Sequence, residues 1–216
     1  MKLKEIYPGV IHVTFKTQYE LCMSFLRLQE FYESPYKEIR LKMFSLEEYM
    51  DVCFKHTGNF TYPKDWSGFN IPGNIYNIFM SLYSGDNAKW SNKESKLFNA
   101  INNFITKRKL KVFYIIGTYK NDTIRHEIAH SFFYLNDAYR NEMKESIKWF
   151  KETCPNVYKK ACKALLKDGY DKSVLEDEIQ AYFSESRTEY FHNRYKVKIS
   201  QQILKVFRKT LNQYLR

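Results

Sequence analysis

The hydrophobic positions along the chain fall into short segments with helical or strand spacing. Apolar residues recur three or four positions apart over residues 45–54 and 93–107, which predicts a helix in each range. Ser45, followed by Glu48 three residues later, is typical of a capping box at the start of the first helix. The aromatic stretch 60–74 contains turn-forming pairs with Pro or Gly and is expected to form a loop.

After residue 110 the spacing changes to that of a strand. Residues 111–119 are rich in β-branched and aromatic side chains, and Gly117 lies near their end. Asn121, Asp122 or Thr123 can cap the helix that follows. Further helices are expected over 126–134 with an extension toward Phe150 after an interruption near Asn136, over 157–167 before Gly169, over 173–193, and from Ser200 to Tyr214. These elements predict a mostly helical α+β fold with a small sheet, in one domain over residues 1–216.

The composition is that of a globular protein. Hydrophobic residues make up 44% and aromatic residues 18% of the chain, which argues against disorder. No run of about 18 apolar residues is present, so we expect no membrane span. The start of the chain is charged and lacks the apolar stretch of a secretory signal, so a cytoplasmic location is expected. The four cysteines form no CxxC pair and are expected to be reduced: Cys22, Cys53, Cys154 and Cys162.

The chain is basic, with 35 Lys and Arg against 24 Asp and Glu and a net charge of +11. Such a charge can indicate a nucleic-acid partner when the cations are clustered. Here they are scattered, and the only short run is 107–111. The sequence therefore favours a solvated basic surface over a nucleic-acid interface.

The strongest chemical signal is the segment His126-Glu127-Ile128-Ala129-His130, an HExxH motif. On a helix, two histidines four residues apart project from one face, so both imidazoles can reach one metal ion. In metallopeptidases with this motif the glutamate binds no metal and accepts a proton from a water that zinc has acidified. Glu127 is therefore the candidate general base, beside the candidate zinc ligands His126 and His130.

Two ordinary histidines on an amphipathic helix are the alternative. Phe132, Phe133 and Leu135 indicate a largely buried helix, in which unpaired imidazoles would be costly. A third metal ligand is still needed. Metzincins require Gly and His or Asp at offsets that here hold Phe133 and Asn136, which excludes that class. A glutamate from a later helix points to 173–193 and its acidic residues Glu176, Asp177, Glu178, Glu185 and Glu189.

The HExxH segment, together with Asp177-Glu178-Ile179-Gln180-Ala181-Tyr182, resembles the gluzincin-type zinc metallopeptidases, whose third-ligand helix carries Asn/Asp-Glu-x-x-Ala or similar. The resemblance covers about two helices and the preceding strand. It implies a zincin-like fold, a zinc ion held by His126, His130 and Glu178, and hydrolysis of peptide bonds with Glu127 as base. It also implies that 111–119 is the edge strand with which an extended peptide substrate pairs.

The third ligand has a rival on the same helix. At about 100° per residue Glu178 and Glu185 fall on one helical face, so Glu185 is either the ligand or a partner of a ligating imidazole. Thermolysin-like members place an acidic residue one turn after the ligand glutamate, where this chain has Tyr182. Candidates for stabilising an oxyanion are His192, Tyr190 and Tyr195. His12 and His56 are isolated and are expected to be structural.

These features predict a zinc-dependent hydrolase, a metallopeptidase acting on a peptide or protein substrate. The leading alternative keeps the zinc without catalysis, in a zinc-stabilised binding or structural protein. The second alternative is a basic nucleic-acid-binding protein whose HExxH segment is accidental.

Overall fold

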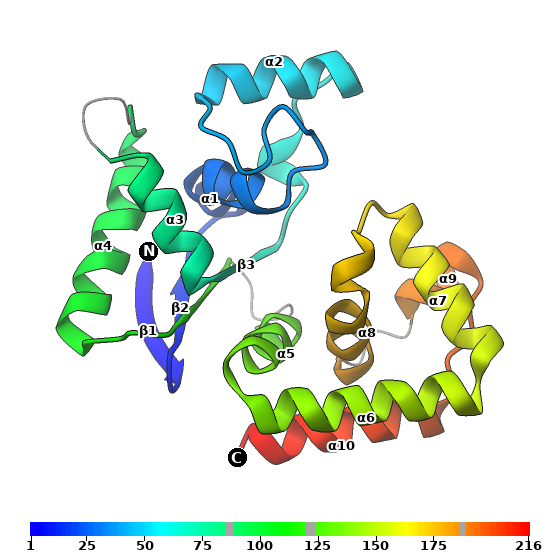
Figure 1. Cartoon of the computed structure of the whole chain (residues 1–216). Helices are drawn as coiled ribbons and strands as arrows, with labels where there is room; N and C mark the ends of the chain where they lie inside the picture. Colours follow the sequence, from blue (N-terminus) through cyan, green and yellow to red (C-terminus); the bar gives the residue numbers. More distant parts are fainter. Residues whose placement is uncertain (85–88, 120–123, 186–188) are drawn as a thin grey trace. The chain divides into compact units, whose positions relative to one another are not determined.

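The computed structural model describes residues 1–84, 89–119, 124–185 and 189–216, and of residues 189 and 190 it describes the backbone alone (Figure 1). Contacts within the chain divide it into two compact units, Met1–Ile124 and Arg125–Arg216. The single domain expected over residues 1–216 stays a prediction. The expected helix caps at 121–123 lie outside the described residues.

The first unit contains a mixed four-stranded sheet in the order β1-β2-β4-β3. β1 pairs antiparallel with β2, β2 parallel with β4, and β4 antiparallel with β3. The elements of this unit, in chain order, are β1 Lys2–Tyr7, β2 Val10–Thr14, α1 Gln18–Glu33, α2 Leu46–Thr57, the 3-10 turn η1 Tyr62–Lys64, β3 Gly68–Pro72, α3 Gly73–Leu82, α4 Asn92–Arg108 and β4 Tyr114–Thr118.

β4 confirms the strand expected over 111–119, but the expectation that it is an edge strand is wrong. Ile115 pairs with Ile11 of β2 on one side and with Ile71 of β3 on the other. All five residues of β4 are buried. An unbroken apolar run is typical of a strand covered on both faces of the sheet, and the pairing on both sides makes β4 an interior strand.

The stretch 60–74, expected to be a loop, instead contains η1, the strand β3 and the start of α3. Phe69 and Ile71 of β3 are buried while Asn70 between them is less so, which is the alternation of a strand. This strand forms because its backbone pairs with β4, a distant segment that the local turn signals of 60–74 do not reveal. α1 lies against this sheet and approaches β4 closely, since a Cβ on Gly117 would come within 2.6 Å of the Phe25 ring.

The helices and 3-10 turns of the second unit are its secondary structure within the described residues. α6 packs along α10 and against α8, as Figure 1 shows, and α7 packs against α6 and α8. Phe183 of α8 lies 5.3 Å from both Phe150 of α6 and Phe207 of α10, measured between ring centroids. The elements are α5 Ile124–Leu135, α6 Asp137–Thr153, α7 Pro155–Lys167, the 3-10 turn η2 Lys172–Val174, α8 Leu175–Ser184, α9 Glu189–Tyr195 and α10 Gln201–Tyr214.

Most expected helix boundaries in this unit are confirmed, with one correction. Asn136 separates α5 from α6 and caps α6 with its side chain, and Ser200 caps α10. The single helix expected over 173–193 is wrong, because α8 ends at Ser184 and Glu185 is extended. Ser flanks Glu185 on both sides in the sequence, and Ser is a weaker helix former than Ala, Leu or Glu. Among the described residues, no helix is long and apolar enough to cross a membrane.

Candidate metal centre

α5 and α8 bring together the three residues expected to bind a metal. The Nε2 atoms of His126 and His130 face each other at 3.1 Å. Glu178 of α8 reaches both, with Oε2 at 3.9 Å from His126 Nε2 and Oε1 at 3.7 Å from His130 Nε2. All the potential ligand atoms lie within 4.8 Å of one another, an arrangement that could hold a metal ion.

Two observations test whether these residues fit a metal. Glu178 Oε2 is buried and, within the described chain, has no hydrogen-bond partner. A buried carboxylate oxygen without a partner is costly, and a cation at this point would satisfy it. Two imidazole nitrogens on one tetrahedral zinc would be about 3.3 Å apart, given Zn–N bonds of about 2.0–2.1 Å, and the observed 3.1 Å is close to this. The donor set therefore fits.

The second nitrogen of each imidazole faces a different carboxylate. His130 Nδ1 lies 2.9 Å from Asp177 Oδ1, and His126 Nδ1 lies 3.3 Å from Glu185 Oε2. Neither Nδ1 makes a regular hydrogen bond within the described residues, so these are ion-pair contacts. Glu178 thus lies on the Nε2 side of both rings and Glu185 on the Nδ1 side of one, which separates the two rival carboxylates.

Behind Asp177 lies a hydrogen-bond chain that the sequence reading missed. Gln180 Nε2 donates to Asp177 Oδ1 at 2.8 Å, and the Tyr139 hydroxyl donates to Gln180 Oε1 at 2.7 Å. Gln180 and Tyr139 are completely buried. The spacing of Asp177 and Gln180, three residues apart on one helix, was a usable signal, whereas Tyr139 on α6 had none.

Charge around the centre is strongly negative for a protein of net charge +11. Burial lowers the pKa of His130, but the carboxylates of Asp177, Glu178 and Glu127 outweigh it and raise this pKa to about 10. Burial raises the pKa of Glu178, which His130 and His126 lower in part. The carboxylates that favour a proton on this imidazole would also favour a metal cation in the place of that proton.

Glu127 is buried at 6% exposure on α5, between the two histidines in sequence. The negative charge of its carboxylate raises the pKa of both His130 and Glu178. The charge of Glu127 adds to that of Asp177 and Glu178 around His130.

Of the remaining candidate residues, Tyr182 contacts one of the two histidines. Tyr182 packs edge-on against His126, with ring centroids 4.7 Å apart, and its hydroxyl lies 3.2 Å from that of Tyr170. His192 is exposed on α9, and the Tyr195 hydroxyl donates to Asp168. The side chain of Tyr190 lies outside the described residues. Within the described chain, no contact brings His192 or Tyr195 to the two histidines.

The two isolated histidines lie in the first unit. His12 is buried, with Nε2 2.8 Å from Thr118 Oγ1, which fits a structural role. His56 stacks on the Tyr36 ring, and its Nε2 lies 3.6 Å from Glu38 Oε1. Neither belongs to a cluster of potential metal ligands among the described residues.

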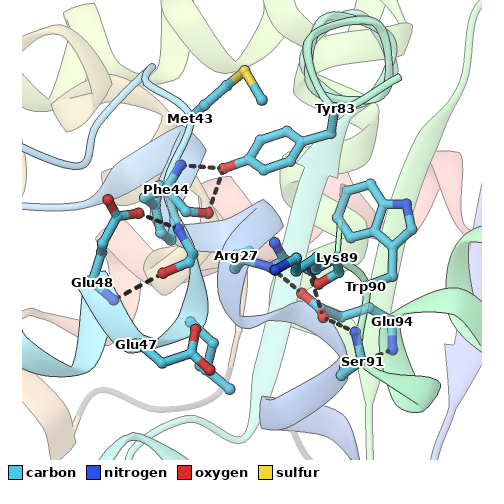
Figure 2. Close-up of a pocket in the computed structure, with 12 residues that line it drawn as sticks. Arg27, Met43, Phe44, Glu47, Glu48, Tyr83, Lys89, Trp90, Ser91 and Glu94 are labelled. Carbon is cyan, nitrogen blue, oxygen red and sulfur yellow. Dashed lines mark hydrogen bonds and ion pairs between the residues drawn. The ribbon is translucent and has the colours of Figure 1, made fainter. Parts of the chain in front are cut away.

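A pocket of about 410 Å³ in the first unit is lined by the starts of α2 and α4 (Figure 2). Its central charge is Arg27, whose Nε and Nη2 donate to the two carboxylate oxygens of Glu94 at 2.6 and 2.9 Å. The guanidinium also lies 4.6 Å from the Trp90 ring. Arg27 and Glu94 satisfy each other's charge, so this pair stabilises the pocket from within.

A shallow groove on α10 carries a cluster of cations: Lys205, Arg208, Lys209 and Arg216. The sequence analysis found no such cluster, because only Arg208 and Lys209 are neighbours in the chain, while Lys205 lies one helical turn before them and Arg216 follows the end of α10. Their spacing opposite the apolar stripe of α10 was the available signal.

Comparisons with known protein families, with curated proteins and with solved structures gave no match to this chain.

Proposed function

We propose that the protein is a metallopeptidase-like hydrolase and that its second unit contains the zinc centre, with His126, His130 and Glu178 as the ligands. The observation that carries the proposal is the convergence of both Nε2 atoms on Glu178, whose buried Oε2 makes no hydrogen bond within the described residues. Two imidazoles and one carboxylate are a donor set that catalytic zinc uses, because it leaves a fourth position for water or substrate.

When bound, zinc would supply Lewis acidity, which lowers the pKa of water and polarises a carbonyl. Glu127 would accept the proton of the attacking water on its carboxylate and pass it to the leaving amine. Its burial supports this role, since few waters compete for that carboxylate. We further propose a peptide or protein substrate, a zincin-like fold and a cytoplasmic location.

Glu127→Gln tests the catalytic part of the proposal. The amide is nearly isosteric but accepts no proton, so zinc binding should persist while activity falls by about 10²- to 10⁴-fold. The assay uses the full chain and a broad peptide library. Glu176→Gln is the matched control, because Glu176 lies on α8 and pairs with Lys151, away from either histidine contact.

Cleavage that is equally fast in Glu127→Gln would contradict the role of Glu127 and leave the zinc site standing. If the zinc-loaded chain cleaves no peptide and binds no hydroxamate, the fourth position is closed and the zinc is structural. If the chain takes up no zinc and binds nucleic acid in a salt-dependent way, it is a basic nucleic-acid-binding protein instead.

A further inference from the structure

We propose that Glu185 and the chain Tyr139–Gln180–Asp177 are positioning groups that hold His126 and His130 with Nε2 turned toward the metal. This inference rests on the proposed zinc site. Its basis is that each imidazole has its own carboxylate on the Nδ1 side, Asp177 for His130 at 2.9 Å and Glu185 for His126 at 3.3 Å.

The chemistry of imidazole explains what such partners do. A neutral imidazole carries one proton, so a ring that offers the Nε2 lone pair to a metal must carry its proton on Nδ1. An acceptor placed at Nδ1 selects this tautomer, fixes the ring orientation and makes the ligand more basic. Both histidines of the centre have an acceptor on that side.

Asp177 is itself held in place from a third helix. Gln180 Nε2 donates to Asp177 Oδ1, which leaves Oε1 of the same amide to accept from the Tyr139 hydroxyl. The orientation of the Gln180 amide is therefore determined at both ends. Because Tyr139 and Gln180 are fully buried, water does not compete for these bonds, and α6 fixes Asp177 against His130 of α5.

Glu185 reaches His126 by a different route. The position one turn after Glu178 holds Tyr182, so the acid comes from the first residue beyond α8, where the backbone is extended. Arg125, next to His126, donates from Nε to the carbonyl oxygen of Ser184 at 3.3 Å. This bond ties the start of α5 to the end of α8 and places Glu185 beside the His126 ring.

The test measures zinc affinity of the full chain by competition with a chelator in Asp177→Ala and Glu185→Ala. Each should weaken zinc by about 10- to 100-fold, the usual cost of removing such a partner. Glu176→Ala is the matched control, since it removes an equal charge from α8 without a histidine contact. Asp177→Asn, which keeps an acceptor oxygen, should lose less affinity than Asp177→Ala.

A second readout separates positioning from simple charge. In proton NMR of the zinc-loaded chain, the slowly exchanging Nδ1–H signal of His130 should disappear only in Asp177→Ala, and that of His126 only in Glu185→Ala. Circular dichroism of the metal-free variants checks that they are folded, and Asp177→Asn with Glu185→Gln replaces any that are not.

Equal zinc affinity in Asp177→Ala, Glu185→Ala and Glu176→Ala, with both signals retained, would overturn the positioning role and leave the zinc site intact. Failure of the unmodified chain to bind zinc would overturn both proposals.

Discussion

Glu178 and Glu185 approach the same histidine from opposite sides of its ring. Glu178 lies on the side of His126 Nε2 and also reaches His130, whereas Glu185 lies on the side of His126 Nδ1. Only a group on the Nε2 side of both rings can share one ion with them. The two acids are therefore expected to contribute unequally to metal binding.

Replacing each acid by Ala makes this difference measurable. Glu178→Ala removes a proposed ligand and should weaken zinc by more than about 100-fold, while Glu185→Ala should stay within about 10- to 100-fold. Isothermal titration in the presence of a competing chelator gives both values. A larger loss in Glu185→Ala would show that the ligand was assigned to the wrong carboxylate.

A second residue, Glu30 of α1, makes the first unit sensitive to pH. Burial raises its pKa from 4.5 to about 7, although the nearby hydroxyls of Ser34 and Tyr49 lower it in part. The folded state therefore prefers the neutral acid. Its stabilisation is fully present below pH 4.5, where the unfolded chain also holds the proton, and is lost as the pH rises to about 7.

We expect Glu30→Gln to remove this dependence. A shift of this size corresponds to about 3 kcal/mol, so the difference in free energy of unfolding between the two proteins should change by up to that amount between pH 4.5 and 7. Urea denaturation at several pH values measures it. Parallel pH profiles for the two proteins would contradict the burial of a neutral acid.

At the scale of elements, two helices begin with the same capping box, but the glutamate of only one of them also pairs with a buried arginine. Ser45 with Glu48 caps α2, and Ser91 with Glu94 caps α4, each with both reciprocal bonds. Glu48 is exposed, whereas Glu94 is buried and also accepts from Arg27, which is only 3% exposed. Loss of Glu94 leaves a buried guanidinium without its charge partner.

Glu48→Ala removes one hydrogen bond of the capping box and should cost about 1 kcal/mol in free energy of unfolding, whereas Glu94→Ala should cost about 3–5 kcal/mol. Chemical denaturation of both variants compares the same cap with and without the buried pair. Equal losses would mean that the Arg27–Glu94 pair adds no stability beyond the cap.

The elements that sequence predicted well are those that local signals specify. α2 and α10 begin where Ser45 and Ser200 predict, because a capping hydroxyl acts within one turn. β3 was missed because its pairing with β4 is not written in 60–74 itself. The interior place of β4 likewise depends on partners far away in the chain.

The candidate site shows the same division. The spacing of His126 and His130 and the likeness around Glu178 named a cluster that the structure brings together. The shared helical face of Glu178 and Glu185 was the wrong reason to link them, since α8 ends at Ser184. Only tertiary packing determines on which side of an imidazole each carboxylate lies.

At the scale of the whole molecule, the proposed metal lies within one of the two units. His126, His130 and Glu178 all belong to Arg125–Arg216, and the sheet belongs to Met1–Ile124. A ligand that binds only the folded state stabilises the region that holds it. Zinc is therefore expected to protect the second unit selectively.

Hydrogen exchange with and without a chelator tests this expectation. Removal of zinc should speed amide exchange in α5 and α8 and leave β2 and β4 unchanged. His126→Ala provides the control, since its exchange should not respond to the chelator. Equal changes in the sheet and in α5 would contradict a metal confined to the second unit.

The most direct measurement is the metal content of the purified full chain after zinc loading, determined by inductively coupled plasma mass spectrometry. We expect about one zinc per chain in the unmodified protein and in Glu127→Gln, and well below that in His126→Ala and His130→Ala with their helical content preserved. Stoichiometric zinc in both histidine variants, or none in the unmodified chain, would contradict the proposed site.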